Sequence, residues 1–375
     1  MSSIQKVHLS VPEEELVALR QRLNNTRWPD RETADDWSQG VPMARMRALC
    51  ECWAGAYDWR RCEALLNRFG LYATEIDGLL IHFLHIRSRR SNALPLLLTH
   101  GWPGSIIEFH RVIEPLVTGE PDQIAFDLVI PCLPGYGFSQ KPKSPGWTVE
   151  RIARAWVKLM AGLGYERYAA QGGDWGAAVT VAMAKLAPPQ LAGIHLNMPL
   201  VIPPNSERGE PDAEQLSALQ ALELYRRDEN AYARLQATRP QTIGYGLVDS
   251  PIAQAAWIYE KFYVWSDCRG DPDGLFTTDA LLDNIMLYWL PGTGASSARL
   301  YWESFRNAFA PTVIDVPVGC SIFPKEIIPA ARRWAEKYYR NLIYWNKLER
   351  GGHFAAFEQP ALFVQEMRNC FSRLP

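Results

Sequence analysis

The sequence has 375 residues, of which 47% are hydrophobic and 21% are charged, and its formal net charge is −2. These values are typical of a globular protein with a large core, and they exclude a preference for nucleic acid or a membrane surface on electrostatic grounds. We find no apolar signal-peptide core and no run of about 18 apolar residues that would predict a transmembrane helix. The seven scattered cysteines are typical of free thiols in a reducing compartment, so we expect a cytoplasmic protein.

Residues 1–90 are predicted to form an N-terminal extension that packs on the core. A helix is expected soon after Pro12, and a second helical pattern runs over residues 42–67. Strands are expected at residues 72–76 and 79–85. Three histidines precede the sheet that is expected to carry the site and are therefore poor candidates for it: His8, His82 and His85.

From residue 91 the pattern alternates between strands and helices, which predicts a mostly parallel sheet with helices on both faces. The core is expected in two parts, residues 91–198 and 311–375. Residues 199–310 interrupt the alternation with an irregular helical pattern rich in Tyr and Trp, and this predicts an inserted helical cap. The core strands are expected at residues 94–99, 126–131, 168–170, 194–198, 316–322 and 343–346.

The stretch Gln171-Gly172-Gly173-Asp174-Trp175-Gly176 lies between an expected strand and an expected helix. This order is typical of a nucleophile elbow, in which small neighbours allow a strained residue to present its side chain clear of the sheet. Serine usually occupies the tip, whereas this chain has Asp174. A carboxylate attacks a saturated carbon that carries a leaving group, and it forms an ester that water must hydrolyse. On this motif alone, a turn aspartate that caps a helix is an equal alternative.

The partners of such a nucleophile follow it along the chain in the order acid, then histidine. His353 lies in a glycine-rich loop after the last expected strand and is the predicted base, whereas His195 falls within a strand and is predicted to be structural. Glu326 lies just beyond an expected strand and is the predicted acid. Asp315 would lie at the wrong end of that strand, and Glu358 is expected to cap the last helix or to form a surface pair.

The turn His100-Gly101-Trp102-Pro103 follows a strand and opens a helix. Its backbone amide at Trp102 is predicted to form an oxyanion hole together with the amide of Trp175. Trp102, Trp175 and Phe354 are also predicted to line the substrate pocket. The alternative for Trp102 is an aromatic residue of the core.

Taken together, these motifs resemble those of the microsomal-type epoxide hydrolases of the α/β-hydrolase superfamily. The resemblance covers essentially the whole chain, through the segments NNTRWPD, HGWPGS, GYGFS, GGDWG, FPKE and RGGHFAAFEQP. It implies that Asp174 is the nucleophile, Glu326 the acid and His353 the base.

The resemblance further implies that two cap tyrosines act as acids over the nucleophile. The segment from Asn230 to Pro240 resembles the one that holds the first, which gives Tyr232, and the segment from Ser297 to Glu303 resembles the one that holds the second, which gives Tyr301. Other tyrosines are near in the sequence and stay open as alternatives: Tyr225, Tyr245 and Tyr288.

The implied activity is the hydrolysis of an epoxide, bulky or aryl, to a vicinal diol through an ester on Asp174, with no metal or organic cofactor. The expected partners are the small-molecule epoxide and water, without nucleic acid or membrane, and a homodimer is left open. The membrane-anchoring N-terminal helix of the mammalian members is missing, which indicates a soluble, bacterial-type member.

The alternatives are a haloalkane-type dehalogenase and a non-catalytic binding protein with the α/β-hydrolase fold. A serine esterase is disfavoured because no GxSxG sequence occurs. Detoxification and a step in secondary metabolism, such as enediyne biosynthesis, both stay open as roles.

Overall fold

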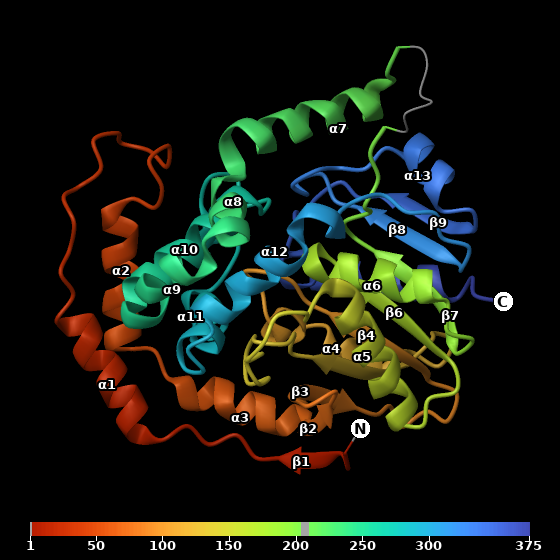
Figure 1. The fold of residues 1–375 in the computed structure, drawn as a ribbon, viewed down its shortest axis with the longest axis horizontal. Coiled ribbons are helices and arrows are strands. Elements are labelled where there is room, and N and C mark those ends of the chain that lie inside the picture. Colours follow the sequence, from red (N-terminus) through yellow and green to blue (C-terminus); the bar gives the residue numbers. More distant parts are fainter. Residues whose placement is uncertain (1, 204–209) are drawn as a thin grey trace.

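The computed structural model describes residues 2–203 and 210–375 of the chain. A nine-stranded sheet runs through the molecule in the order β1-β2-β3-β5-β4-β6-β7-β8-β9 (Figure 1). The strands from β5 to β9 in this order pair in parallel, and β1, β2 and β3 add an antiparallel edge. The predicted α/β class with a mostly parallel sheet is therefore confirmed. The strands are β1 (Gln5–Val7), β2 (Leu71–Ile76), β3 (Leu79–Ile86), β4 (Leu94–Thr99), β5 (Phe126–Pro131), β6 (Tyr168–Gly172), β7 (Leu191–Leu196), β8 (Val318–Ile322) and β9 (Leu342–Lys347).

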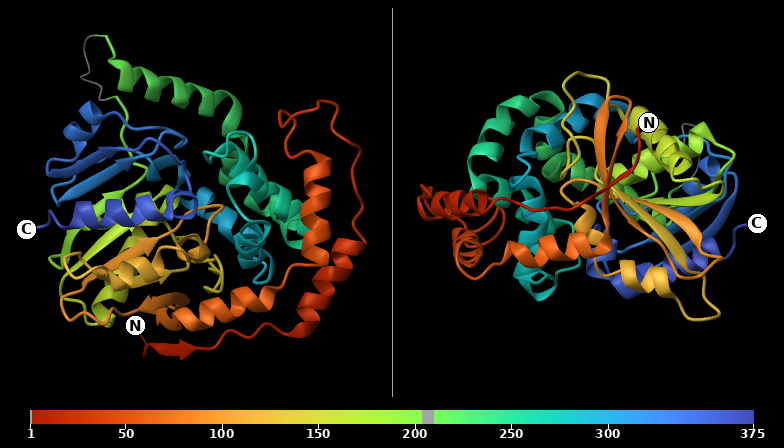
Figure 2. Two further views of the ribbon diagram at one scale, coloured as in Figure 1. Left: turned by 180° about the vertical axis from the view of Figure 1, so that it is seen from behind. Right: turned by 90° about the horizontal axis from the view of Figure 1, so that it is seen from below.

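Helices cover both faces of the parallel part of the sheet (Figure 2). Helices α5 and α6 pack on one face, and α4 and α15 pack on the other. Because both faces are covered, the central strands are continuous apolar runs, such as the sequence LPLLLT of β4. The helices of the core are η1 (Ile106–Phe109), α4 (Ile113–Thr118), α5 (Val149–Gly162), α6 (Asp174–Leu186), α13 (Arg332–Tyr338), α14 (Ala355–Glu358) and α15 (Pro360–Phe371).

The N-terminal segment extends the sheet as well as contacting the cap. Helices α1 and α2 lie beside cap helices (Figure 1). The prediction that His82 and His85 precede the sheet of the site is wrong, because β3 pairs with β5 in the register Phe83↔Pro131. Hydrogen bonds between strands far apart in the sequence make β3 part of the sheet, and the local sequence pattern does not show which strands pair.

The helical pattern expected over residues 42–67 is two helices with a break between them. Gly55 ends the first helix, and the side chain of Asp58 accepts a hydrogen bond from the backbone N–H of Arg60 to begin the second. The helices of this segment are α1 (Glu13–Asn24), α2 (Met43–Ala54) and α3 (Trp59–Phe69).

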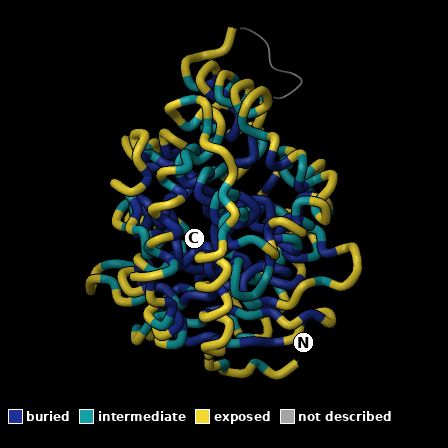
Figure 3. Tube along the Cα trace, turned by 90° about the vertical axis from the view of Figure 1, so that its left-hand side faces the viewer, coloured by how far each residue is buried: buried dark blue, intermediate teal, exposed yellow. Residues whose placement is uncertain are grey.

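A group of helices lies between β7 and β8, where the cap is expected. Residues 204–209 of the expected cap lie outside the described residues. Helix α7 projects from the body (Figure 1), and only Gln215 and Ala218 among its residues are buried (Figure 3). The division of the chain at residues 90, 198 and 310 stays a prediction. The cap helices are α7 (Ala213–Leu224), η2 (Tyr225–Glu229), α8 (Ala231–Thr238), α9 (Pro240–Asp249), α10 (Pro251–Val264), η3 (Pro272–Gly274), α11 (Thr278–Trp289) and α12 (Gly294–Ala308).

Within residues 2–203 and 210–375, no helix has both the length and the apolar character that crossing a membrane requires.

Candidate active site

Asp174 lies at the first position of α6, directly after the end of β6 and Gly173. Its φ angle is +50°, in the left-handed region that a residue with a side chain rarely adopts. The glycines around it make this turn possible. A Cβ atom at Gly101 would overlap the Asp174 carboxylate, and one at Gly176 would overlap the backbone of Thr99. The chain therefore adopts the tight strand–turn–helix geometry that its motif predicts.

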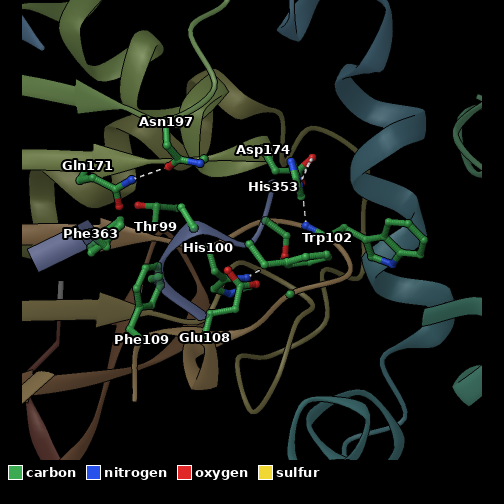
Figure 4. A pocket seen from close by; sticks show the side chains of 16 residues that line it. Thr99, His100, Trp102, Glu108, Phe109, Gln171, Asp174, Asn197, His353 and Phe363 are labelled. Atoms are coloured by element: carbon green, nitrogen blue, oxygen red, sulfur yellow. Dashed lines mark hydrogen bonds and ion pairs between the residues drawn. The ribbon is translucent and has the colours of Figure 1, made fainter. Parts of the chain in front are cut away.

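Two backbone amides hold the Asp174 carboxylate. The N–H of Trp102 donates to Oδ1 at 2.7 Å (Figure 4), and the backbone N–H of Trp175 is near enough to lower the pKa of this carboxylate. Burial raises the pKa of Asp174, whereas the nearby His353 and these two amides act in the opposite direction. These amides are the ones predicted to form the oxyanion hole, and they lie where an ester of Asp174 would have its carbonyl oxygen.

His353 lies between Asp174 and Glu326, and all three are at most 7% exposed. Its Nδ1 is 2.6 Å from Glu326 Oε1, and its Nε2 is 3.7 Å from Asp174 Oδ2. The backbone N–H of Ile327 also donates to Glu326 Oε1, at 2.8 Å, which fixes the carboxylate that faces the imidazole. The three residues predicted as nucleophile, base and acid are thus brought together in this order.

The pKa of His353 reflects competing effects. Burial alone would lower it, but the carboxylates of Glu326 and Asp174 raise it to about 9. The imidazole is therefore protonated at neutral pH. An ester on Asp174 would remove one of these carboxylates, and this would make the neutral, basic form of His353 easier to reach.

The loops that carry the acid and the base are joined to each other. The backbone N–H of Lys325 donates to the carbonyl oxygen of Gly351 at 3.1 Å, next to the bridge between Lys325 and Gly352. The backbone N–H of His353 donates to the carbonyl oxygen of Trp265, in the segment that follows α10, at 2.9 Å. The loop of the predicted base is therefore joined both to the loop of Glu326 and to the cap.

The prediction that Glu358 caps the last helix or forms a surface pair is wrong. Glu358 is 5% exposed, and its carboxylate accepts hydrogen bonds from the backbone amides of Gly352 at 2.9 Å, Phe354 at 3.0 Å and Asp267 at 2.8 Å. Burial raises its pKa to about 7, although these amides lower it. Two of these donors flank His353. The Glu358 carboxylate therefore fixes the loop that carries His353 and does not form a surface pair.

A cavity of about 370 Å³ lies between the cap and the core, with Asp174 in its wall. This volume lies within the range of small-molecule sites. Most of the wall is aliphatic or aromatic, and the two predicted acids, Tyr232 and Tyr301, are part of it. The predicted nucleophile and the two tyrosines therefore face one apolar space.

The two tyrosines are almost fully buried and close to one another. The ring centroids of Tyr232 and Tyr301 are 5.9 Å apart. The Tyr232 hydroxyl is 3.4 Å from that of Tyr225, and the Tyr301 hydroxyl makes no hydrogen bond in the described part of the chain. Burial is the main cause that raises the pKa of Tyr232 and of Tyr301 well above the ordinary value. Both phenols keep their protons at neutral pH and can act as donors.

The positions of the three alternative tyrosines show which of them could act as an acid. Tyr245 is 71% exposed, and the Tyr288 hydroxyl donates to the carbonyl oxygen of Gly104 at 2.6 Å. Neither lines the cavity, whereas Tyr225 does. Tyr225 is therefore the one alternative that also faces the nucleophile.

A second, smaller cavity of about 20 Å³ also has Asp174 in its wall (Figure 4). This volume holds roughly one water molecule. His353 lines this cavity together with the polar side chains of Gln171, Asn197 and Glu108. None of these four residues lines the apolar cavity. Among the described residues, Asp174 is the only one that lines both cavities.

Glu108 is a residue that the sequence reasoning missed. Its carboxylate lies so close to Gly104 that a Cβ atom there would overlap it. Burial raises the pKa of Glu108 to about 8, with His353 lowering it and Asp174 raising it. The available signal was a carboxylate four residues after Gly104, at the start of the helix that follows the oxyanion turn.

The remaining predicted residues lie around the site in different ways. Trp102 and Phe354 line the small polar cavity, and neither they nor Trp175 lines the apolar one. Trp175 is fully buried and contacts the Tyr301 ring edge-on at 4.7 Å. His195 is also fully buried, and its Nε2 lies 2.8 Å from the hydroxyl of Ser321. Within the described ranges, no group of three His, Cys, Asp or Glu side chains could hold a metal ion.

Two families of known proteins match this chain. Residues 4–109 match the family described as epoxide hydrolase N terminus, and residues 95–241 match the alpha/beta hydrolase fold family.

Relatives are similar over nearly the whole chain. A protein of Stigmatella aurantiaca, provisionally named an epoxide hydrolase, is 55% identical over 98% of this chain and 84% of its own length. Epoxide hydrolase 1 of Sus scrofa is 34% identical over 98% of this chain and 88% of its own length.

Solved structures agree with the sequence matches. The epoxide hydrolase of Aspergillus niger superposes with a TM-score of 0.89 and is 31% identical, covering 100% of this chain and 97% of that one. The juvenile hormone epoxide hydrolase of the silkworm Bombyx mori has a TM-score of 0.88 and is 32% identical, covering 100% and 94% of the two chains.

Proposed function

Because this chain belongs to the epoxide hydrolase family, with the α/β-hydrolase fold, we propose that it converts an epoxide and water to a vicinal diol through an ester on Asp174. The position of Asp174 between the two cavities carries this proposal. The apolar cavity brings the carboxylate together with two phenol donors, and the polar cavity brings it together with His353. The carboxylate must first attack the epoxide and its ester must then be attacked by water. The first step needs the phenol donors of the apolar cavity, and the second needs His353 in the polar cavity.

Ring opening takes place in the apolar cavity. Asp174 Oδ2 attacks an epoxide carbon, the bond from this carbon to the ring oxygen breaks, and a proton from Tyr232 or Tyr301 moves to that oxygen. The other phenol stabilises the developing charge by a hydrogen bond. Oδ1, which accepts the N–H of Trp102, becomes the carbonyl oxygen of the ester.

Ester hydrolysis takes place from the polar cavity. His353 Nε2 removes a proton from a water molecule, and the hydroxide adds to the ester carbon, while the amides of Trp102 and Trp175 stabilise the oxyanion. The intermediate collapses with loss of the diol. Because His353 is an imidazolium at rest, it first gives its proton to the tyrosinate that ring opening leaves, and water activation then restores the imidazolium, so that one epoxide and one water give one diol and the resting enzyme.

The alternatives fit the site less well. A halide leaves without a proton, so a dehalogenase would not need two buried phenols beside its nucleophile. A non-catalytic binding protein would not need a buried His353–Glu326 pair. Burying such a pair costs free energy of folding, and catalysis gives a reason to keep it. The nucleophile, base and acid are all in contact or near contact here.

The apolar cavity also bears on the substrate. Its volume and aromatic wall suit a bulky or aryl epoxide. The charged residues in the described wall are Asp174 and two exposed arginines, Arg226 and Arg306. We propose that an epoxide with a carboxylate remote from the ring is accepted better than its methyl ester, and comparing KM for such a pair tests this.

We also propose a cytoplasmic location. All seven cysteines are unpaired, which fits a reducing compartment. A homodimer is an untested prediction that the mass of the protein in solution would check.

The first test is diol formation from styrene oxide by the wild type and by Asp174→Ala. Diol that depends on Asp174 supports the proposal. Halide released from a haloalkane, without any diol, would assign the chain to dehalogenase chemistry instead. In the wild type, a quenched reaction should also show the protein mass raised by one substrate molecule, and this adduct should be absent from Asp174→Ala.

A further inference from the structure

A lysine side chain is buried beside one of the two proposed acids. Lys261, on α10, is 3% exposed, although lysine is almost never fully buried without a partner. Its Nζ is 2.9 Å from the carboxylate of its neighbour Glu260, whose side chain is 30% exposed. The ammonium group therefore lies in the protein interior with its counter-ion toward the solvent side.

The ammonium group of Lys261 lies on aromatic rings. Its Nζ is 4.5 Å from the ring centroid of Tyr232 and 5.4 Å from that of Trp265, within the range of cation–π contacts. The Tyr232 ring is also stacked on Trp102, with the ring centroids 5.0 Å apart and an interplanar angle of 12°. Tyr232 thus contacts both an indole and a buried cation.

This arrangement has a chemical consequence for Tyr232. A positive charge against the ring favours the form in which the phenol oxygen carries negative charge. That charge develops when Tyr232 gives its proton to an epoxide oxygen. Burial and the Asp174 carboxylate oppose this loss by raising the pKa of Tyr232 well above its ordinary value. The Lys261 charge acts against them at the moment of proton transfer.

We propose that Lys261 is a positioning residue that fixes its ammonium group against the ring of Tyr232 and thereby strengthens Tyr232 as the proton donor in ring opening. The proposal rests on the proposed epoxide hydrolysis and on the role of Tyr232 in it. Two carboxylates modulate the ammonium group from the cap, Glu260 by direct contact and Glu229 by charge at longer range. Tyr301, which has no cation on its ring among the described contacts, is the matched comparison.

The test is a double-mutant cycle of Lys261→Met and Tyr232→Phe, because Met keeps the length of the lysine stem without its charge. The rates of ester formation and of ester hydrolysis are measured separately in single turnovers by rapid quench. Lys261→Met is expected to slow ester formation about tenfold, the size of effect that a desolvated cation–π contact supports. In the Tyr232→Phe background the same change should alter the rate less than about twofold, and ester hydrolysis should change little in either.

Equal slowing in both backgrounds would overturn the proposal, because it would mean that Lys261 only supports the packing of the cap. An unchanged rate in Lys261→Met would overturn it as well. Slowing in the Tyr301→Phe background should match that in the wild type if the effect acts through Tyr232. A wild type that forms no diol refutes the proposed function itself, and is thereby distinguished from a failure of Lys261 alone.

A second variant keeps the test open if Lys261→Met does not fold. Glu260→Gln removes the counter-ion at the partly exposed side and leaves the ammonium group in place. Ester formation should be maintained or become a few-fold faster, since the ammonium charge is less neutralised. Slower ester formation in this variant, with a normal melting temperature, would contradict the proposal.

Discussion

Glu326→Gln is the most direct perturbation of the proposed base. The carboxylate of Glu326 lies 2.6 Å from His353 Nδ1 and is one of the groups that raise the pKa of His353 from 6.5 to about 9. The difference between these two pKa values corresponds to about 3 kcal/mol of stabilisation of the imidazolium. Glutamine keeps an acceptor oxygen at the same place but removes the charge, so most of this stabilisation should be lost.

The expected result is a block at the second step of the reaction. Water activation places a proton on His353, and without Glu326 this imidazolium forms in a buried site where burial lowers the pKa. We expect ester hydrolysis to slow by about 100-fold or more, whereas ester formation changes much less. The ester on Asp174 should therefore accumulate, and it should be visible as an increase in intact protein mass by one substrate molecule.

The control is a carboxylate that the sequence offers but the structure places elsewhere. Asp315 pairs with Arg340 at the surface, and its side chain is 74% exposed. Asp315→Asn should leave both steps unchanged. If Glu326→Gln hydrolyses the ester as fast as the wild type, the reasoning is refuted, and Glu358→Gln becomes the variant to measure.

Three further outcomes follow from the site. The pKa of His353 in the folded state is raised, so its contribution to stability is fully present below pH 6.5 and is lost as the pH rises through about 9. Urea unfolding at pH 6 and at pH 9 should show this loss of stability in the wild type and not in Glu326→Gln. Tyr301→Phe should slow ester formation by about 10- to 100-fold with little change in ester hydrolysis, and equal slowing of both steps in single-turnover kinetics would contradict its role as an acid. Glu108→Gln should lower the pH at which ester hydrolysis reaches its plateau, because a carboxylate that helps to raise the pKa of His353 is removed; an unchanged pH–rate profile would exclude this contribution.

The local features of the site were determined by neighbouring residues. The elbow needs a positive φ at Asp174 and glycines beside it, and both are properties of a few consecutive residues. The same holds for the strand–helix alternation and for the placing of Glu326 and His353 after successive strands. The assignment of roles to Tyr232 and Tyr301 came from resemblance, because no local pattern distinguishes them from other cap tyrosines.

The tertiary structure decided which distant groups meet. The sequence predicted that Glu358 caps the last helix or forms a surface pair, but the fold of its loop turns the carboxylate toward the amides beside His353. Glu108 and Lys261 carry no motif of their own, and each becomes relevant because a turn or a cap helix brings it to Asp174 or Tyr232.

The separation into an apolar and a polar cavity around Asp174 could not be read from the sequence for the same reason. Backbone conformation at a turn depends on the residues within it, whereas a cavity wall depends on how segments far apart in the chain pack together. The sequence by itself therefore predicted the strained turn and the candidate nucleophile at its tip. Only the packing of the cap against the sheet decided what surrounds each side of that carboxylate.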